Sequence, residues 1–183
     1  MNVVDTPLEG LKVATTQAFT DSRGAFSRLF CEQALASVLQ GRRIVQVNHS
    51  LTHQVGAVRG LHFQRAPHAE MKLVRCLSGR IWDVAVDLRM DSPTFLRWHA
   101  EELTPNSGAM LVIPEGFAHG FQALAPDSEL LYLHTAFYEP TAEGGLRHDD
   151  PRLGIRWPLE ARDLSARDLK HPLLDESFLG LPK

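Results

Sequence analysis

Cysteine is scarce in this sequence. The two cysteines, Cys31 and Cys76, are too few for a scaffold held by disulfides, and no Cys-x-x-Cys pair is present to bind zinc or carry out redox chemistry. We therefore expect Cys76 to behave as a small buried apolar residue and Cys31 to be half-buried.

Long hydrophobic runs are missing as well. No apolar stretch approaches the ~20 residues that a membrane-spanning helix needs. The first ten residues carry Asp5 and Glu9 and lack the apolar stretch of a secretory signal. We therefore expect a cytoplasmic protein that does not interact with membranes.

Positive charge is not in excess. Lys and Arg number 19 against 22 Asp and Glu, for a net charge of −3, which excludes a protein that holds nucleic acid by bulk charge. No low-complexity tract or sustained heptad is present, so disorder and coiled coil are also excluded. With 183 residues, 44% of them hydrophobic, the chain can bury a real core, and we expect residues 1–183 to form a single domain.

Short segments of alternating polarity dominate the chain and are separated by turns rich in Gly and Pro. Segment 80–88 shows the pattern most clearly, with one apolar face formed by Trp82, Val84, Val86 and Leu88. Similar strands are predicted at 71–77, 109–113, 119–124 and 130–138. Helices are expected only at 32–39 and 165–169. The pattern predicts an all-β sandwich or barrel with a short helical tail at the C-terminus.

Two motifs, Gly56-(five residues)-His62 and Gly108-(five residues)-Pro114-x-Gly116-x-x-His119, resemble those of the cupin superfamily. The resemblance implies a double-stranded β-helix, or small jelly roll, with both histidines inside one barrel. Metal-binding cupins have His-x-His in the first motif and a Glu seven residues before a Gly. This chain instead has Gln64, and Lys72 stands seven residues before Gly79. Because two of four ligands are replaced, one by an ammonium that repels cations, we expect neither a metal nor another cofactor.

A longer series of motifs resembles the dTDP-4-dehydrorhamnose 3,5-epimerase family and covers the chain from about residue 8 to residue 174. In order, the motifs are Asp21-x-Arg23-Gly24-x-Phe26, Gln46-Val47-Asn48-x-Ser50, Val58-Arg59-Gly60-Leu61-His62-Phe63-Gln64, Met71-Lys72-Leu73-Val74, Asp83-Val84-Ala85-Val86-Asp87-Leu88-Arg89, Ser92-Pro93-Thr94-Phe95, Ile113-Pro114-Glu115-Gly116-Phe117-Ala118-His119-Gly120-Phe121 and Trp157-Pro158.

Epimerisation beside a ketone requires a base on one face of the sugar, an acid on the other, and stabilisation of the enolate between them. His62 suits the base, because histidine has an ordinary pKa near 6.5. The resemblance implies that Asp168 is the partner of His62, that Tyr132 is the proton donor, and that Lys72 places positive charge near the ketone oxygen. Ser165-x-x-Asp168 also has the pattern of a helix-capping box, and the two roles of Asp168 can coexist.

Strand alternation gives an internal test of these assignments. Tyr132, His134 and Tyr138 fall on one face of the predicted strand at 130–138, provided that no bulge intervenes. His62 and Gln64 likewise share a face. Alternation shows only that the assignments are mutually consistent.

The family's substrate site matches eight further residues: Arg23, Phe26, Gln46, Asn48, Arg59, Asp83, His119 and Tyr138. The resemblance implies that the two arginines bind the diphosphate, with the two amides as neutral partners. It places the histidine and the tyrosine beside the substrate and leaves the role of the aspartate open. The phenylalanine is expected to pack on the nucleobase bound by a neighbouring subunit, which implies a homodimer.

We therefore predict a metal-independent nucleotide-sugar epimerase that acts on a dTDP-4-keto-6-deoxyhexose at C3, C5 or both. Arg28 stands where many members have a glutamate near the nucleobase, and Leu133 stands where many have a lysine, so we expect the chain to fall in a divergent branch. A non-catalytic nucleotide-sugar-binding cupin and a metal-dependent cupin are the alternatives. Retention of His62, Lys72 and Tyr132 together favours the enzyme, because binding alone requires neither an acid nor a base.

Overall fold

The computed structural model describes residues 1–182, which fold almost entirely into β-strands. The strands are β1 (Asn2–Asp5), β2 (Lys12–Thr15), β3 (Phe19–Asp21), β4 (Gly24–Phe26), β5 (Gln46–Thr52), β6 (Val58–Gln64), β7 (Lys72–Ser78), β8 (Ile81–Asp87), β9 (Trp98–Leu103), β10 (Ala109–Ile113), β11 (Phe117–Ala123), β12 (Ser128–His134) and β13 (Glu143–Gly145). One α-helix, α1 (Ala36–Leu39), and one 3₁₀ turn, η1 (Asp168–Lys170), complete the described elements.

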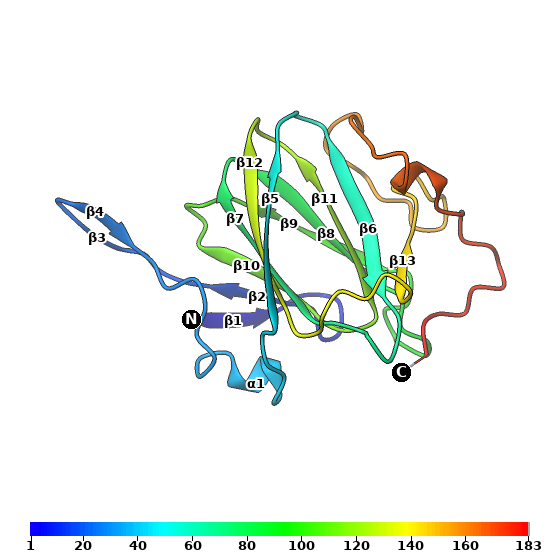
Figure 1. Ribbon diagram of the computed structural model, residues 1–183, viewed down its shortest axis with the longest axis horizontal. Helices are drawn as coiled ribbons and strands as arrows, with labels where there is room; N and C mark the ends of the chain where they lie inside the picture. Colours follow the sequence, from blue (N-terminus) through cyan, green and yellow to red (C-terminus); the bar gives the residue numbers. More distant parts are fainter. Residues whose placement is uncertain (183) are drawn as a thin grey trace.

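The strands form two antiparallel sheets that face each other (Figure 1). One sheet has the order β1-β2-β10-β7-β12-β5, and the other has the order β13-β6-β11-β8-β9. Strands distant in sequence are therefore neighbours, as when β12 lies between β7 and β5. The all-β prediction of a jelly roll is confirmed, and the strands predicted at 71–77, 80–88 and 109–113 are found within one residue at each end.

The main core lies between the two sheets. Val74 and Cys76 on β7 point into it from the first sheet, and Ala85, Phe117 and Phe121 point into it from the second. The alternation in β8 thus sends odd-numbered residues inward. The apolar face predicted from the even-numbered residues is present and forms the outer face of the second sheet.

That outer face is buried because the C-terminal part of the chain covers it. Val84 and Val86 pack there against Leu146 and Leu153 in a second apolar cluster. The three tryptophans belong to this layer and are partly buried, with the ring of Trp82 5.6 Å from both of the others. Since both faces of β8 are buried, its sequence is apolar on both sides apart from the acidic residues.

The outer face of the first sheet is covered by the segment that contains α1. Leu35, Val38 and Leu39 pack there against Leu73 and Met110. The helix ends at Leu39 as predicted but is half the predicted length, because residues 32–35 form turns and no side chain caps its start. The predicted C-terminal helix is reduced to the 3₁₀ turn η1.

Strands β3 and β4 form a separate hairpin that projects away from both sheets (Figure 1). Its two aromatic side chains are exposed, Phe19 to 73% and Phe26 to 69%. At the turn, Asp21 accepts hydrogen bonds from the backbone and the guanidinium of Arg23. The hairpin has no apolar core of its own within this chain.

Two further predictions concern single features. Cys31 is half-buried and Cys76 is buried, both as free thiols, as expected. Within residues 1–182, no helix has the length and apolar character needed to cross a membrane.

Candidate active site

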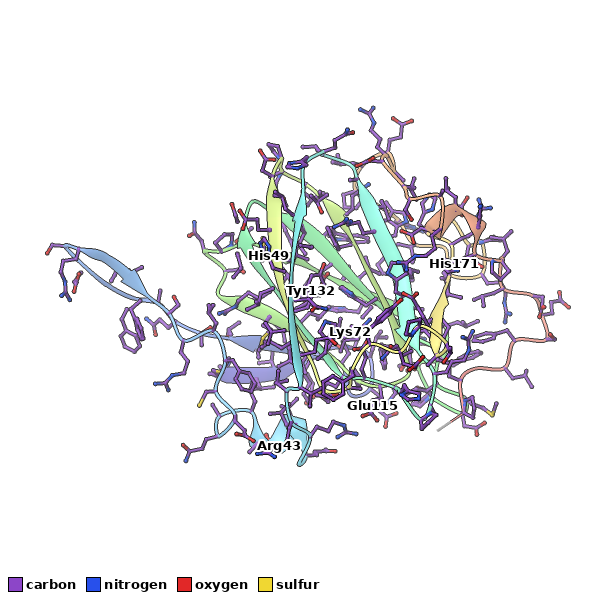
Figure 2. The ribbon with its side chains drawn as sticks, viewed as in Figure 1. Arg43, His49, Lys72, Glu115, Tyr132 and His171 are labelled. Atoms are coloured by element: carbon purple, nitrogen blue, oxygen red, sulfur yellow. The ribbon has the colours of Figure 1, made fainter. Side chains whose placement is uncertain are left out.

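A cavity of about 570 Å³ opens between the two sheets. Its lining comes from β5, β6, β7, β11, β12 and β13, from the segment just before β7 and from the segment that follows β12. Eight of the predicted site residues line it: Gln46, Asn48, Arg59, His62, Lys72, His119, Tyr132 and Tyr138. Figure 2 shows Tyr132 and Lys72 near the middle of the molecule, where the two sheets face each other.

His62 and Asp168 form a hydrogen-bonded pair. His62 lies on β6 and is partly exposed to the cavity, and its Nε2 is 2.7 Å from Oδ1 of the buried Asp168. The other carboxylate oxygen faces the backbone N–H of Gly60 at 3.4 Å. Burial raises the pKa of Asp168, but its bonds to His62 and Gly60 outweigh burial and hold the pKa below its usual value. A carboxylate that accepts the Nε2–H leaves Nδ1 of His62 with the lone pair.

The turn η1 delivers Asp168 to this position. The hydroxyl of Ser165 accepts a hydrogen bond of 3.0 Å from the backbone N–H of Asp168, which is one of the two bonds of a capping box. The carboxylate of Asp168 faces His62 and Gly60 and does not make the second bond. Arg167 also reaches the site, with Nη2 3.2 Å from Nε2 of His62. Its guanidinium is held by Glu143, which lines the cavity.

His171, which Figure 2 shows near β13, does not line the cavity, and its ring centroid lies 6.2 Å from that of His62. Possible ligand atoms of His62, Asp168 and His171 lie within 4.8 Å of one another, a grouping that the sequence motifs did not indicate. It does not coincide with the cupin metal positions, where Gln64 and Lys72 stand. The side-chain amide of Gln64 instead forms hydrogen bonds with the backbone. It donates to the carbonyl oxygen of His68 and accepts from the N–H of Glu139.

Tyr132 projects into the same cavity from β12, in the opposite sheet to His62. Its hydroxyl is 3.1 Å from Oγ of Ser50. Burial raises the pKa of Tyr132 to about 12, although the bond to Ser50 works against this. The phenol therefore keeps its proton at neutral pH and is available as an acid.

Lys72 is the first residue of β7, and its side chain forms an ion pair with Glu70. Nζ of Lys72 is 3.0 Å from Oε1 of Glu70, and both side chains are nearly buried. The second oxygen of Glu70 is 2.7 Å from Nδ1 of His134. Burial raises the pKa of Glu70, but His134 and Lys72 together hold the pKa below its usual value. The side chain of Lys72 thus faces the cavity beside an ionised carboxylate.

A second histidine–carboxylate pair lies deeper in the barrel. Nε2 of His119 is 2.7 Å from Oδ1 of Asp83, and Asp83 is fully buried. The ring of His119 contacts the ring of Tyr132 edge-on, with 6.2 Å between centroids. Asp83, whose role the sequence left open, orients His119 from behind and does not line the cavity.

Besides Asp83 and Asp168, which contact the two histidines from behind the cavity wall, two predicted residues do not line the cavity of their own chain. Arg23 and Phe26 are on the projecting hairpin, where the side chain of Arg23 is 87% exposed. Within residues 1–182 only Arg59, of the two arginines expected at the diphosphate, is brought to the site.

Several polar residues that the structure brings to the site were not predicted from the sequence, and they include Ser50, Glu70, Glu143 and Arg167. Strand alternation was a usable signal for two of them, because Ser50 follows Gln46 and Asn48 at spacings of two and Glu70 precedes Lys72 by two. Nothing local indicated Arg167 or Glu143, which the fold brings together from distant segments.

The barrel and its cavity define a class of protein. An imidazole hydrogen-bonded to a carboxylate lies in one sheet, a protonated phenol lies in the other, and a lysine side chain lines the same cavity. Such groups can remove a proton from carbon next to a carbonyl, stabilise the enolate and return a proton from the other side. The fold and the site therefore define a cupin-type acid–base enzyme.

Comparison with known proteins agrees with this class. The sequence model of the family described as dTDP-4-dehydrorhamnose 3,5-epimerase matches residues 5–176. A protein of that name from Salmonella typhimurium is 41% identical, with 98% of each chain covered. A dTDP-4-dehydrorhamnose 3-epimerase from Streptomyces niveus is 37% identical over 93% of this chain and 82% of its own. The crystal structure of a dTDP-6-deoxy-D-glucose-3,5-epimerase from Legionella pneumophila, in complex with dTDP-4-keto-L-rhamnose, matches with a TM-score of 0.91 and 36% identity over 98% of this chain and 97% of that one.

The chain belongs to the dTDP-4-dehydrorhamnose 3,5-epimerase family. The predicted family, the cupin-type fold and the nucleotide-sugar epimerase activity are thereby confirmed.

Proposed function

We propose that this enzyme inverts C3 and C5 of a dTDP-4-keto-6-deoxyhexose, with His62 as base and Tyr132 as acid. The observation that carries the proposal is that these side chains come from opposite sheets and line one cavity. A sugar ring between them presents one face to each, which is the requirement for inversion.

The first step is removal of the proton from the carbon next to the ketone. Nδ1 of His62 takes this proton, and the electron pair of the C–H bond moves into an enolate whose charge rests on the C4 oxygen. Asp168 then faces an imidazolium, which its carboxylate stabilises through the 2.7 Å bond to Nε2. Lys72 supplies positive charge to the enolate oxygen.

The second step is protonation from the opposite face. Tyr132 gives its phenolic proton to the carbanion carbon, and the enolate collapses to the ketone with inverted configuration. The resulting phenolate accepts a hydrogen bond from Ser50, the hydroxyl already 3.1 Å away. Exchange of His62 and Tyr132 with solvent restores the starting protonation states.

Substrate binding would place the diphosphate on Arg59 and Arg23, with Gln46, Asn48, His119 and Tyr138 around the sugar. Arg59, the amides and Tyr138 line the cavity and can do this within one chain. Arg23 cannot, since it lies on the projecting hairpin.

The hairpin supports the proposal of a homodimer. Phe19 and Phe26 expose most of their surface, and apolar surface of this kind favours association. We propose that the hairpin inserts into a second copy of the chain and brings Phe26 and Arg23 to the nucleotide there. Sedimentation of Phe26→Ser as a monomer with a raised KM would support this. A wild-type monomer with full activity would contradict it.

The test of the reaction is NMR of the product formed from dTDP-4-keto-6-deoxyglucose in D2O. We expect deuterium at both C3 and C5, and absence of exchange at either carbon would contradict the proposal. Deuterium at C3 alone would indicate the second candidate, a 3-epimerase, which the Streptomyces niveus relative favours.

We also propose a cytoplasmic location and a single domain over residues 1–183. The free thiols Cys31 and Cys76 support that location.

A further inference from the structure

Five hydrogen bonds join Lys72 to the outer part of the cavity without interruption. From the buried end, Lys72 contacts Glu70 at 3.0 Å, and Glu70 contacts Nδ1 of His134 at 2.7 Å. Nε2 of His134 is 3.2 Å from Nδ2 of Asn48. The side chains of Lys72, Glu70 and His134 are each about nine-tenths buried. Water therefore has little access to them, and a broken bond would leave a buried polar group without a partner.

The outer end of the series continues through Gln46 to the backbone. Nε2 of Gln46 is 3.3 Å from Oδ1 of Asn48, and Oε1 of Gln46 is 3.2 Å from the backbone nitrogen of Tyr138. A backbone N–H can only donate, so Oε1 of Gln46 must be the acceptor there. This contact fixes which end of the Gln46 amide is oxygen.

The direction of every other bond follows. The amide nitrogen of Gln46 donates to Oδ1 of Asn48, so Nδ2 of Asn48 donates to Nε2 of His134. A nitrogen that accepts carries no proton, and the proton of a neutral His134 is therefore on Nδ1, where Glu70 accepts it. All donors point toward one carboxylate, which also receives the ammonium of Lys72.

We propose that Glu70 and His134 are positioning residues that hold the Lys72 ammonium and orient the amides of Asn48 and Gln46 as donors toward the substrate. The proposal rests on the proposed function, in which Lys72 meets the enolate and the amides meet the nucleotide sugar. Each amide keeps its second N–H free for an acceptor, and phosphate oxygens are acceptors only. His134 also stacks on the ring of Tyr132, with 6.1 Å between centroids.

Glu70→Gln tests the inner half of the series. A glutamine at position 70 can accept from Lys72 or from His134 with its one oxygen, and its NH2 group then opposes a donor. It also removes the carboxylate beside the ammonium. We expect kcat to fall on the order of tenfold or more.

Two substitutions at His134 separate hydrogen bonding from packing. His134→Gln can donate to Glu70 and accept from Asn48, as the Nδ1–H imidazole does, whereas His134→Leu can do neither. We expect His134→Leu to raise KM roughly tenfold and His134→Gln to stay within about threefold of wild type. Asp127→Asn, which breaks the exposed pair with His53, is the matched control and should change neither constant. Equal impairment by Leu and Gln, or a wild-type rate in Glu70→Gln, would overturn the proposal.

The tautomer of His134 provides a readout that packing alone would not set. Side-chain ¹⁵N NMR at neutral pH should show protonated Nδ1 and unprotonated Nε2 in wild type, with His134→Gln used to assign the resonances. An Nε2–H tautomer or an imidazolium would refute the direction of the series. This measurement needs no turnover. If the wild-type enzyme exchanged no deuterium, the proposed function would fail while the tautomer still tested the hydrogen bonds.

Discussion

Asp168→Asn gives a sharp test of the proposed base. An asparagine has nearly the same shape but offers one oxygen and one NH2 group in place of two oxygens. The N–H of Gly60 faces Oδ2 of Asp168, so it selects the amide oxygen at that position. The NH2 group is then left facing Nε2 of His62, the atom that now donates to Asp168.

The substitution should therefore move the proton of His62 from Nε2 to Nδ1. Arg167, with Nη2 3.2 Å from Nε2, favours the same change, because its N–H groups can only donate. Nδ1 is the atom that would take the substrate proton, so the base is blocked in the ground state. The equivalent change of tautomer lowers kcat about 10⁴-fold in serine proteases. We expect roughly 10³- to 10⁴-fold here, or about 4 to 5 kcal/mol of activation free energy.

The assay is the rate of deuterium incorporation from D2O under single-turnover conditions. The loss should appear in this rate with little change in affinity for the substrate, since Asp168 does not line the cavity. Asp127→Asn, in the exposed pair with His53, is the control for the same chemical change and should keep the wild-type rate. If Asp168→Asn retained more than about a tenth of the wild-type rate while folded, the argument from tautomers would be wrong.

Three further predictions follow from the structure. Tyr132→Phe should keep proton exchange at the carbon that faces the base but lose inversion. NMR would then show a deuterated sugar that retains the configuration of the substrate. Normal inversion would exclude the phenol as the acid. Burial raises the pKa of Asp87, but Arg89 and two hydroxyl groups outweigh burial and hold this pKa below its usual value. The ionised carboxylate of Asp87 therefore stabilises the folded protein at neutral pH. This stabilisation is lost as the pH falls below about 4. The difference in free energy of unfolding between wild type and Asp87→Asn should therefore shrink in acid, and a constant difference from pH 7 to pH 3 would contradict the assignment. Gly60→Ala should lower the free energy of unfolding in denaturant by more than about 2 kcal/mol. Gly60 has φ of +122°, and a Cβ added there would lie 2.5 Å from Cα of Gly120. An unchanged midpoint of unfolding would show that the backbone relaxes around the added methyl group.

Strands were predicted correctly where polar and apolar residues alternate clearly and where turn residues mark both ends of the strand. Strands β7, β8 and β10 fall where alternation and the neighbouring turns placed them. Strand β12 ends at His134, whereas the pattern continued to Tyr138, because pairing with β5 and β7 stops there. The helix predicted at 32–39 ends at the expected residue but begins four residues later, because residues 32–35 form turns and no side chain caps the helix.

The sequence by itself determined the family and most of the chemistry of the site. His62, Lys72 and Tyr132 stand in motifs whose order and spacing can be read without coordinates, and the loss of two cupin metal ligands is equally visible. These are properties of residue type and position along the chain, which folding does not alter.

Only the tertiary structure decided which of these residues meet and in what direction their hydrogen bonds run. Glu70 and His134 are 64 positions apart, and His62 and Asp168 are 106 apart, so no local pattern relates them. The structure also separates Arg23 and Phe26 from the cavity of their own chain. The physical reason is that a β-sheet pairs segments distant in sequence, and the direction of a hydrogen bond depends on the partner that each strand brings.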